Sequence, residues 1–184
     1  MELMHHYCTA TGNIIAFRQD TLHVWRVILP EEAYKHSYIM HGLLAISALH
    51  KAHLIPSDRS TYLTLDAHHQ SLELEEYTLQ ITKVSDETWK PLFSFASILI
   101  IYAALLPKRS GRGELQSPIL DLLDLFSYRR GIQTVFEPFL IQIRQSCLAP
   151  LAYGVWVIQT EENTRYHHFL REGLEDSTRP STSG

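Results

Sequence analysis

The chain has 184 residues, of which 45% are hydrophobic and 20% are charged. This composition fits one globular domain and excludes a disordered polar chain. The net charge is -4 and the 16 Lys and Arg residues are scattered, so the sequence offers no basic stripe for direct binding to nucleic acid.

The two cysteines, Cys8 and Cys147, lie far apart in apolar segments and predict no disulfide framework. Residues 1–7 lack the pattern of a secretory signal, which favours an intracellular location. The longest apolar stretch, residues 92–106, is shorter than the roughly twenty residues that cross a bilayer. We therefore expect a buried helix there and no membrane span.

Apolar residues recur at spacings of three and four, and sustained alternation is rare. This pattern predicts an all-α, single-domain bundle of about six helices. The first expected helix covers residues 3–17, with Gly12 as a point of kinking. The second covers residues 20–29, and Pro30 is expected to end or redirect it.

The third expected helix, residues 31–54, is apolar on nearly every side. Such a helix normally lies at the centre of a bundle. Its small residues Gly42, Ala45 and Ala48 would let a neighbouring helix or a ligand approach closely.

A fourth helix is expected over residues 58–84, after the break at Pro56. Its residues at helical spacing predict the inward stripe Tyr62, Leu65, His69, Leu72, Glu76 and Leu79. A fifth helix should begin at Ser85, whose hydroxyl would accept a first-turn amide, and should end before Pro107.

Residues 107–116 contain Pro, Gly and basic residues and predict a loop, including the short basic cluster 108–112. The sixth helix should open at Pro118 and break near Pro138. The segment 148–158 fits either a helix or a buried turn. We expect one helical domain over residues 1–174 and a disordered polar tail over residues 175–184.

The sequence is rich in histidine, with eleven copies. His50 and His53, one helical turn apart, form the best metal-ligating pair, but no carboxylate stands three or four residues away to complete a site. The sequence favours histidines that bond backbone carbonyls or face solvent, and we expect neither a metal nor a cofactor. No glycine-flanked nucleophile or nucleotide-binding loop is present, so no catalytic residue is assigned.

The expected helices at residues 31–54 and 85–106 combine small and aromatic residues, a mixture suited to lining a cavity for a flat apolar molecule. In this interpretation a hydroxyl of the ligand would meet His41 or Ser47. The alternative is plain core packing, which the spacing alone favours. The candidate pocket residues are Tyr38, Met40, His41, Leu44, Ser47, Phe93, Phe95 and Tyr102.

Five parts of the chain are similar to the regulatory domain of fungal zinc-cluster transcription factors, especially those like the sterol uptake control proteins. The block from His36 to His50 is the most specific part, and the likeness extends to about Gly131. The parts are Glu2–Tyr7, Trp25, His36–His50, Ala67–Gln70 and Leu92–Ser97.

This resemblance implies an all-helical C-terminal domain that, in sterol regulators, binds ergosterol in a hydrophobic pocket and controls activation and nuclear entry. It also implies a nuclear or cytoplasmic location. The DNA-binding module of the family needs six cysteines around two zinc ions, so with two cysteines in all this chain should not bind DNA itself.

Our first hypothesis is a regulatory domain that senses an apolar small molecule such as a sterol or terpenoid, or that forms a homodimer or a heterodimer with a related regulator. The second is a biosynthetic enzyme of the cyclase or isomerase type that folds a terpenoid or polyketide in the same apolar pocket. The third is a remnant of a longer regulator that acts by dimerising with a full-length relative.

Overall fold

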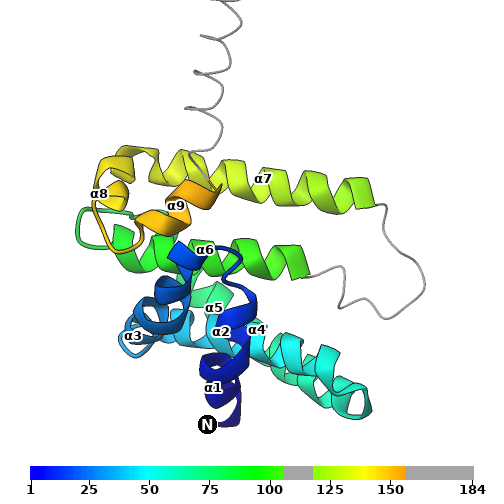
Figure 1. The fold of residues 1–184 in the computed structure, drawn as a ribbon. Coiled ribbons are helices and arrows are strands. Elements are labelled where there is room, and N and C mark those ends of the chain that lie inside the picture. The colour runs from blue at the N-terminus through cyan, green and yellow to red at the C-terminus, as the bar shows by residue number, and fades with distance from the viewer. Residues whose placement is uncertain (106–117, 156–184) are drawn as a thin grey trace, which may run out of the picture.

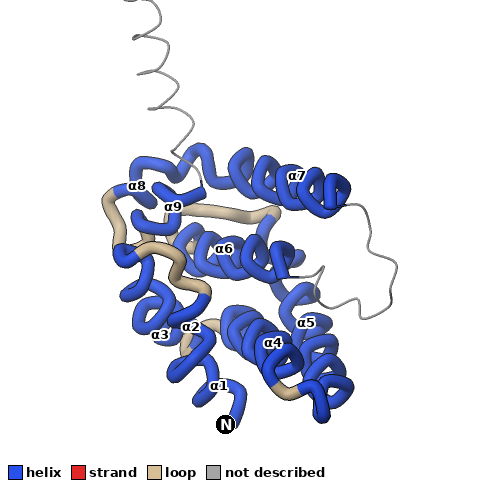
Figure 2. Tube along the Cα trace, turned by 45° about the vertical axis from the view of Figure 1, so that its right-hand side comes forward, coloured by secondary structure: helices blue, strands red, loops and turns tan. Residues whose placement is uncertain are grey.

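The computed structural model describes residues 1–105 and 118–155, and all regular elements in these ranges are helical. The prediction of an all-α bundle is therefore confirmed. Both views place the helices in three tiers, with α1 to α5 on one side, α6 across the middle and α7 to α9 on the other side (Figures 1 and 2). The expected loop at 107–116 and the tail at 175–184 lie outside the described residues.

The N-terminal helical stretch runs through α1 (Glu2–His6), the π-helical turn η1 (Tyr7–Thr11) and α2 (Gly12–Ile14). Gly12 is buried against the turn before it, and a Cβ atom at this position would lie 3.3 Å from the carbonyl oxygen of Tyr7. At the position of the expected kink, the helix widens into the π turn η1, and the backbone of this turn packs closely against Gly12.

Pro30 does not end a helix, and the predicted boundary at this residue is wrong. The 3-10 turn η2 (Gln19–Thr21) and the π turn η3 (Val24–Ile28) lead directly into α3 (Leu29–Ala33). Pro30 lies in the first turn of α3, where proline is tolerated because its fixed φ suits the start of an α-helix. The chain breaks instead at residues 34–36, where His36 has extended backbone.

The central helix of the bundle is α4 (Ser37–Leu54), and it contacts α1, α3, α5 and α6. Gly42, Ala45 and Ala48 are all buried, which confirms the central position predicted for this segment. Small side chains on α4 let its neighbours pack close to its backbone.

The inward face of α5 (Arg59–Ile81) matches the predicted stripe in part, because Tyr62, Leu65, His69 and Glu76 are half-buried. Leu72 and Leu79 are 40% and 70% exposed, whereas Asp66 and Tyr77 are buried. The prediction was wrong at the two leucines because packing against α4 turns a face with a buried carboxylate toward the core. A 3-10 turn, η4 (Pro56–Asp58), precedes this helix.

α6 (Trp89–Leu105) begins four residues later than Ser85 and ends at the edge of the described range. Ser85 opens the turn before it, but the expected cap is reversed, because the Thr88 hydroxyl accepts the Ser85 N–H at 2.9 Å. Two buried serines on this apolar helix, Ser94 and Ser97, each donate to the carbonyl four residues earlier, at 2.9 Å. Polar residues thereby fit into the core without loss of a hydrogen bond.

The last tier contains α7 (Pro118–Phe136), the 3-10 turn η6 (Glu137–Phe139), α8 (Leu140–Arg144) and α9 (Ala149–Val155). The start at Pro118 and the break at Pro138 agree with the sequence prediction. The ambiguous segment after Leu148 forms a helix as far as residue 155.

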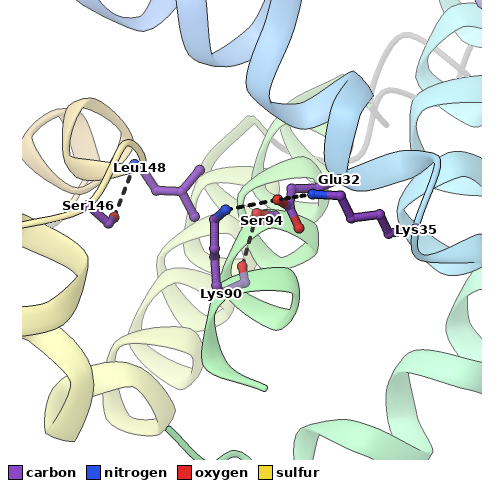
Figure 3. Close-up of polar contacts among 6 residues, drawn as sticks. All are labelled: Glu32, Lys35, Lys90, Ser94, Ser146 and Leu148. Atoms are coloured by element: carbon purple, nitrogen blue, oxygen red, sulfur yellow. Dashed lines mark hydrogen bonds and ion pairs between the residues drawn. The ribbon is translucent and has the colours of Figure 1, made fainter. Parts of the chain in front are cut away.

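A buried carboxylate joins the first tier to the second. The Glu32 carboxylate on α3 is 5% exposed and accepts from Lys90 on α6 at 2.8 Å and from Lys35 at 3.2 Å (Figure 3). Burial opposes the charge of Glu32, but the two lysines outweigh it and hold its pKa below the ordinary value. α3 is therefore held on α6 by a paired charge.

Candidate functional site

A cavity of about 360 Å³ lies at the end of α4, where the N-terminal helical stretch, the start of α5 and the end of α6 converge. Its size falls within the usual range of roughly 300 to 1,000 Å³ for ligand pockets. We call it the α4 cavity. The described residues that line it are Thr11, Ile14, Ile15, Ile46, Leu49, His50, His53, Leu54, Arg59 and Leu105.

The walls of the α4 cavity are apolar and its deepest side chains belong to the core. Ile15, Ile46 and Leu49 are 4%, 0% and 6% exposed. At its outer edge Ile14 and Leu54 are more than half exposed. The cavity therefore opens to solvent at one side. Hydration of its apolar walls is unfavourable.

His50 is the polar centre of the cavity wall. Its Nδ1 atom lies 2.9 Å from the Thr11 hydroxyl and 3.1 Å from the Nε2 atom of His6. Burial, with the neighbouring His6 and His53, lowers the pKa of His50, so the ring is neutral at pH 7. As a neutral imidazole, His50 carries one N–H donor and one acceptor nitrogen.

The outer polar residues of the cavity are His53, which is exposed, and Arg59, which is half-buried. Both are nitrogen donors, and none of the ten described lining residues is acidic. Asp58 precedes Arg59 but is exposed and does not line the cavity. The polar side of the α4 cavity therefore consists of one guanidinium, two imidazoles and the Thr11 hydroxyl.

A second polar cluster fixes the N-terminal helix beside this cavity. Lys51 on α4 forms an ion pair with Glu2, and the Tyr62 hydroxyl on α5 donates to the same carboxylate at 3.0 Å. The hydrogen bonds from Lys51 and Tyr62 hold the pKa of Glu2 below its ordinary value. These contacts keep α1, α4 and α5 together where the cavity forms.

The eight residues predicted from the sequence as a pocket lie elsewhere, and none of them lines the α4 cavity. Tyr38 and Phe95 pack edge to face with ring centroids 5.5 Å apart, and Tyr77 contacts both rings. Phe93 packs on Phe136 of α7 with ring centroids 5.4 Å apart. These aromatic residues fill the core between α4, α5, α6 and α7.

The other predicted pocket residues lie along α4 and α6. Met40, His41 and Leu44 are half-buried on α4, and Nδ1 of His41 lies 2.9 Å from Nδ1 of His69 on α5. The Tyr102 hydroxyl donates to the buried carboxylate of Asp66 at 2.7 Å. The structure thus divides the eight residues among several contacts.

Two hydroxyls in this set have no hydrogen-bond partner among the described residues. The Tyr38 Oη and Ser47 Oγ atoms are both fully buried. Buried polar atoms usually have a partner, in the protein or in water or ligand. A ligand contact at Tyr38 and Ser47 therefore stays a prediction.

A shallower hollow of about 400 Å³ lies between α5, α6 and α7. Its lining is almost entirely apolar and carries no ionisable side chain except Tyr77. It therefore has fewer polar groups for ligand binding than the α4 cavity. The residues that line it are Tyr77, Ile81, Leu99, Ser127, Gly131, Ile132 and Val135.

Within residues 1–105 and 118–155, no three His, Cys, Asp or Glu side chains group as metal ligands. None of the helices in the same ranges combines the length and apolar character of a bilayer-spanning segment.

Sequence reasoning missed the residues that make the α4 cavity polar. It noted His50 and His53 only as a metal pair, and it did not consider Thr11 or Arg59. The spacing of His50 and His53 one turn apart places both on one face of α4. Thr11 and Arg59 come from other elements, and no local pattern in the sequence connects them with α4.

The chain is similar to Sterol uptake control protein 2 of Saccharomyces cerevisiae, with 25% identity over 180 residues. The alignment covers 96% of this chain but only 17% of that protein. No protein-family profile matches the chain, and no solved structure matches it. The similarity relates the chain distantly to a control protein and supports a regulatory role in general terms.

Proposed function

We propose that this chain is a transcription-factor-like regulatory domain that senses an apolar small molecule in the α4 cavity. One observation carries the proposal, an apolar cavity of about 360 Å³ with the neutral His50 ring in its wall. The similarity to a sterol uptake control protein supports a sterol as the first ligand to test.

The position of the cavity supports a regulatory use. Its wall is built from four elements of the chain, so an occupant contacts the N-terminal helical stretch, α4, α5 and α6 at once. A ligand shifts a conformational equilibrium only when it binds one state better than another. Bound between these elements, it would favour the state in which they are docked, with a typical coupling of about 1 to 3 kcal/mol.

We also propose a cellular location and binding partners for the domain. We place the domain in the nucleus or the cytoplasm, and it acts on transcription through a DNA-binding partner, a dimer with a related regulator or its own longer chain. The contact at Tyr38 and Ser47 remains a second candidate for ligand binding on the other part of α4.

The experiment is ligand binding by the full chain with the cavity open or filled. Ergosterol is added to the purified 184-residue protein, and binding is followed by native mass spectrometry and by the shift in unfolding temperature. Ile14→Trp places a large ring at the open side, and because Ile14 is 59% exposed the fold should tolerate it. We expect at least tenfold weaker ergosterol binding by I14W, because the ring occupies the entrance.

The matched control is Ile141→Trp on α8, a 70% exposed isoleucine that does not line the cavity. This variant should bind ergosterol as the unchanged protein does. Absence of any sterol binding or of thermal stabilisation would contradict sterol sensing, and equal binding by I14W would contradict the α4 cavity as the site.

A further inference from the structure

The N-terminal helical stretch forms one wall of the α4 cavity, through Thr11, Ile14 and Ile15. Two polar contacts that dock this wall on α4 meet at one atom, Nδ1 of His50. The Thr11 hydroxyl lies 2.9 Å from it, and Nε2 of His6 lies 3.1 Å from it. The protonation of a single pair of histidines therefore bears on how the wall is held.

Protonation of both rings removes the hydrogen bond between His6 and His50, whichever nitrogen carries the proton in the neutral rings. A doubly protonated pair has only N–H donors and no acceptor. The two facing nitrogens, 3.1 Å apart, would then both be donors on positively charged rings. Because like charges at this distance repel each other, the docked position of the wall becomes less favourable.

The charged and ionisable groups around this contact come from α1, α4 and α5. Burial and the Lys51 ammonium lower the pKa of His6, and the Glu2 carboxylate opposes them. Burial, with the neighbouring His6 and His53, lowers the pKa of His50. The docked wall therefore favours neutral rings. The groups are Glu2 and His5 on α1, Lys51 and His53 on α4, and Arg59 and Tyr62 on α5, while α6 contributes the apolar Leu105.

We propose that the His6–His50 contact is a pH-dependent switch, which holds the N-terminal wall of the α4 cavity on α4 at neutral pH and loosens it in mild acid. Rings released from the contact bind protons at a pKa of about 6.5, above that of the docked rings, so acid favours the loosened wall. The nearby ion pair of Glu2 and Lys51 does not titrate in this range, because their contact lowers the pKa of Glu2 and raises that of Lys51. The effect on a ligand rests on the proposed function: its affinity should fall as the pH falls below about 6.5.

The first test needs no ligand and follows amide hydrogen exchange of the full chain by mass spectrometry at about pH 7.5 and pH 5.5. After correction for the intrinsic exchange rate, residues 2–15 should lose roughly five- to tenfold of their protection in acid, relative to α6. His6→Gln keeps a side chain that can donate and accept but cannot take up a proton. This variant should lose clearly less protection, because one of the two titrating groups is gone.

The matched control is H41Q/H69Q, which removes the other histidine pair of α4 and does not touch the cavity. It should keep the full acid effect on residues 2–15. Urea unfolding at pH 7.5 checks the fold of H6Q, and His6→Asn is the second variant. Equal protection of residues 2–15 at the two pH values would overturn the inference. So would the full acid effect in H6Q, or an equal loss of protection in α6.

The second test measures the affinity for ergosterol at the same two pH values. Ergosterol has no group that titrates in this range, so a change in affinity comes from the protein. We expect binding about fivefold weaker at pH 5.5, with a smaller change in H6Q and the full change in H41Q/H69Q.

The outcomes separate this inference from the proposed function. Loosening of residues 2–15 in acid, without ergosterol binding at either pH, would uphold the switch and contradict sterol sensing. Ergosterol binding that I14W blocks, with the same affinity at both pH values, would uphold the cavity and overturn the switch. Neither loosening nor binding would overturn both.

Discussion

At the scale of single residues, buried polar groups explain how this apolar bundle keeps one arrangement. Tyr7 donates to the backbone carbonyl of Trp25 at 2.8 Å, and Tyr102 donates to Asp66 at 2.7 Å. Burial raises the pKa of Tyr7 far above its ordinary value, so the phenol remains a donor. Each bond joins segments that are distant in sequence, and a wrong packing would leave its polar atoms without a partner.

The hydrogen bond from Tyr102 to Asp66 predicts a measurable loss of stability. Tyr102→Phe removes the hydroxyl and keeps the ring, so a buried carboxylate loses a donor at a cost of about 1 to 3 kcal/mol. Urea denaturation measures this change. Tyr34→Phe, at a tyrosine that is 74% exposed, is the control and should change stability by less than about 0.5 kcal/mol. An equal effect of the two substitutions would contradict a stabilising role of the buried hydroxyl.

At the scale of elements, two histidine pairs hold the neighbours of α4. His6 on α1 contacts His50, and His41 contacts His69 on α5 with stacked rings 5.2 Å apart. Two imidazole nitrogens form a hydrogen bond only when one carries a proton and the other does not. Each pair therefore keeps its hydrogen bond only while at least one of its two rings is neutral.

These pairs predict a loss of stability in mild acid. Burial lowers the pKa of His6, His41, His50 and His69 in the folded chain. The unfolded chain binds protons first, at a pKa of about 6.5, so the stabilisation is complete above that pH and is lost as the pH falls through the lower folded pKa values. Urea unfolding between about pH 7.5 and pH 5 should show this decline.

The variant H41Q/H69Q should make the decline less steep, because it removes two of the four groups. His23→Gln is the matched control at an exposed histidine and should leave the slope unchanged. Stability that does not depend on pH in this range, or an equal slope for the double variant, would contradict the role of the pair.

At the scale of the whole molecule, α4 makes the larger part of the contact between the first tier and α6, and α3 and α5 add smaller contacts. Its apolar residues Leu43 and Ile46 are fully buried, and the helices on either side pack against them. The α4 cavity lies at the end of this helix, between elements that a ligand could hold together. Under the proposed function, a ligand in the cavity would act on the neighbouring helices through packing.

The charge of the whole chain predicts that it does not bind DNA by itself. With a net charge of -4 and scattered basic residues, it is expected to release few of the counterions that drive nucleic-acid binding. Fluorescence anisotropy of labelled duplex DNA should show no sequence-selective binding by the purified chain at physiological salt. Tight selective binding would contradict this prediction and the proposal that the domain works through a DNA-binding partner.

Helical periodicity alone was sufficient to predict the all-α class, because the spacing of apolar residues reflects the pitch of the helix. The central place of α4 also followed from its sequence, since a helix that is apolar on nearly every side must be covered on every side. Pro118 and Pro138 marked the start and the break of a helix because proline acts on its own local backbone.

The tertiary structure alone decided the face of α5, the burial of Asp66 and the composition of the α4 cavity. Thr11, His50 and Arg59 lie on three elements that are separate in sequence, and only the packing angles of these elements bring the side chains to one wall. Periodicity carries no information on those angles, because they depend on how side chains from distant segments fit together.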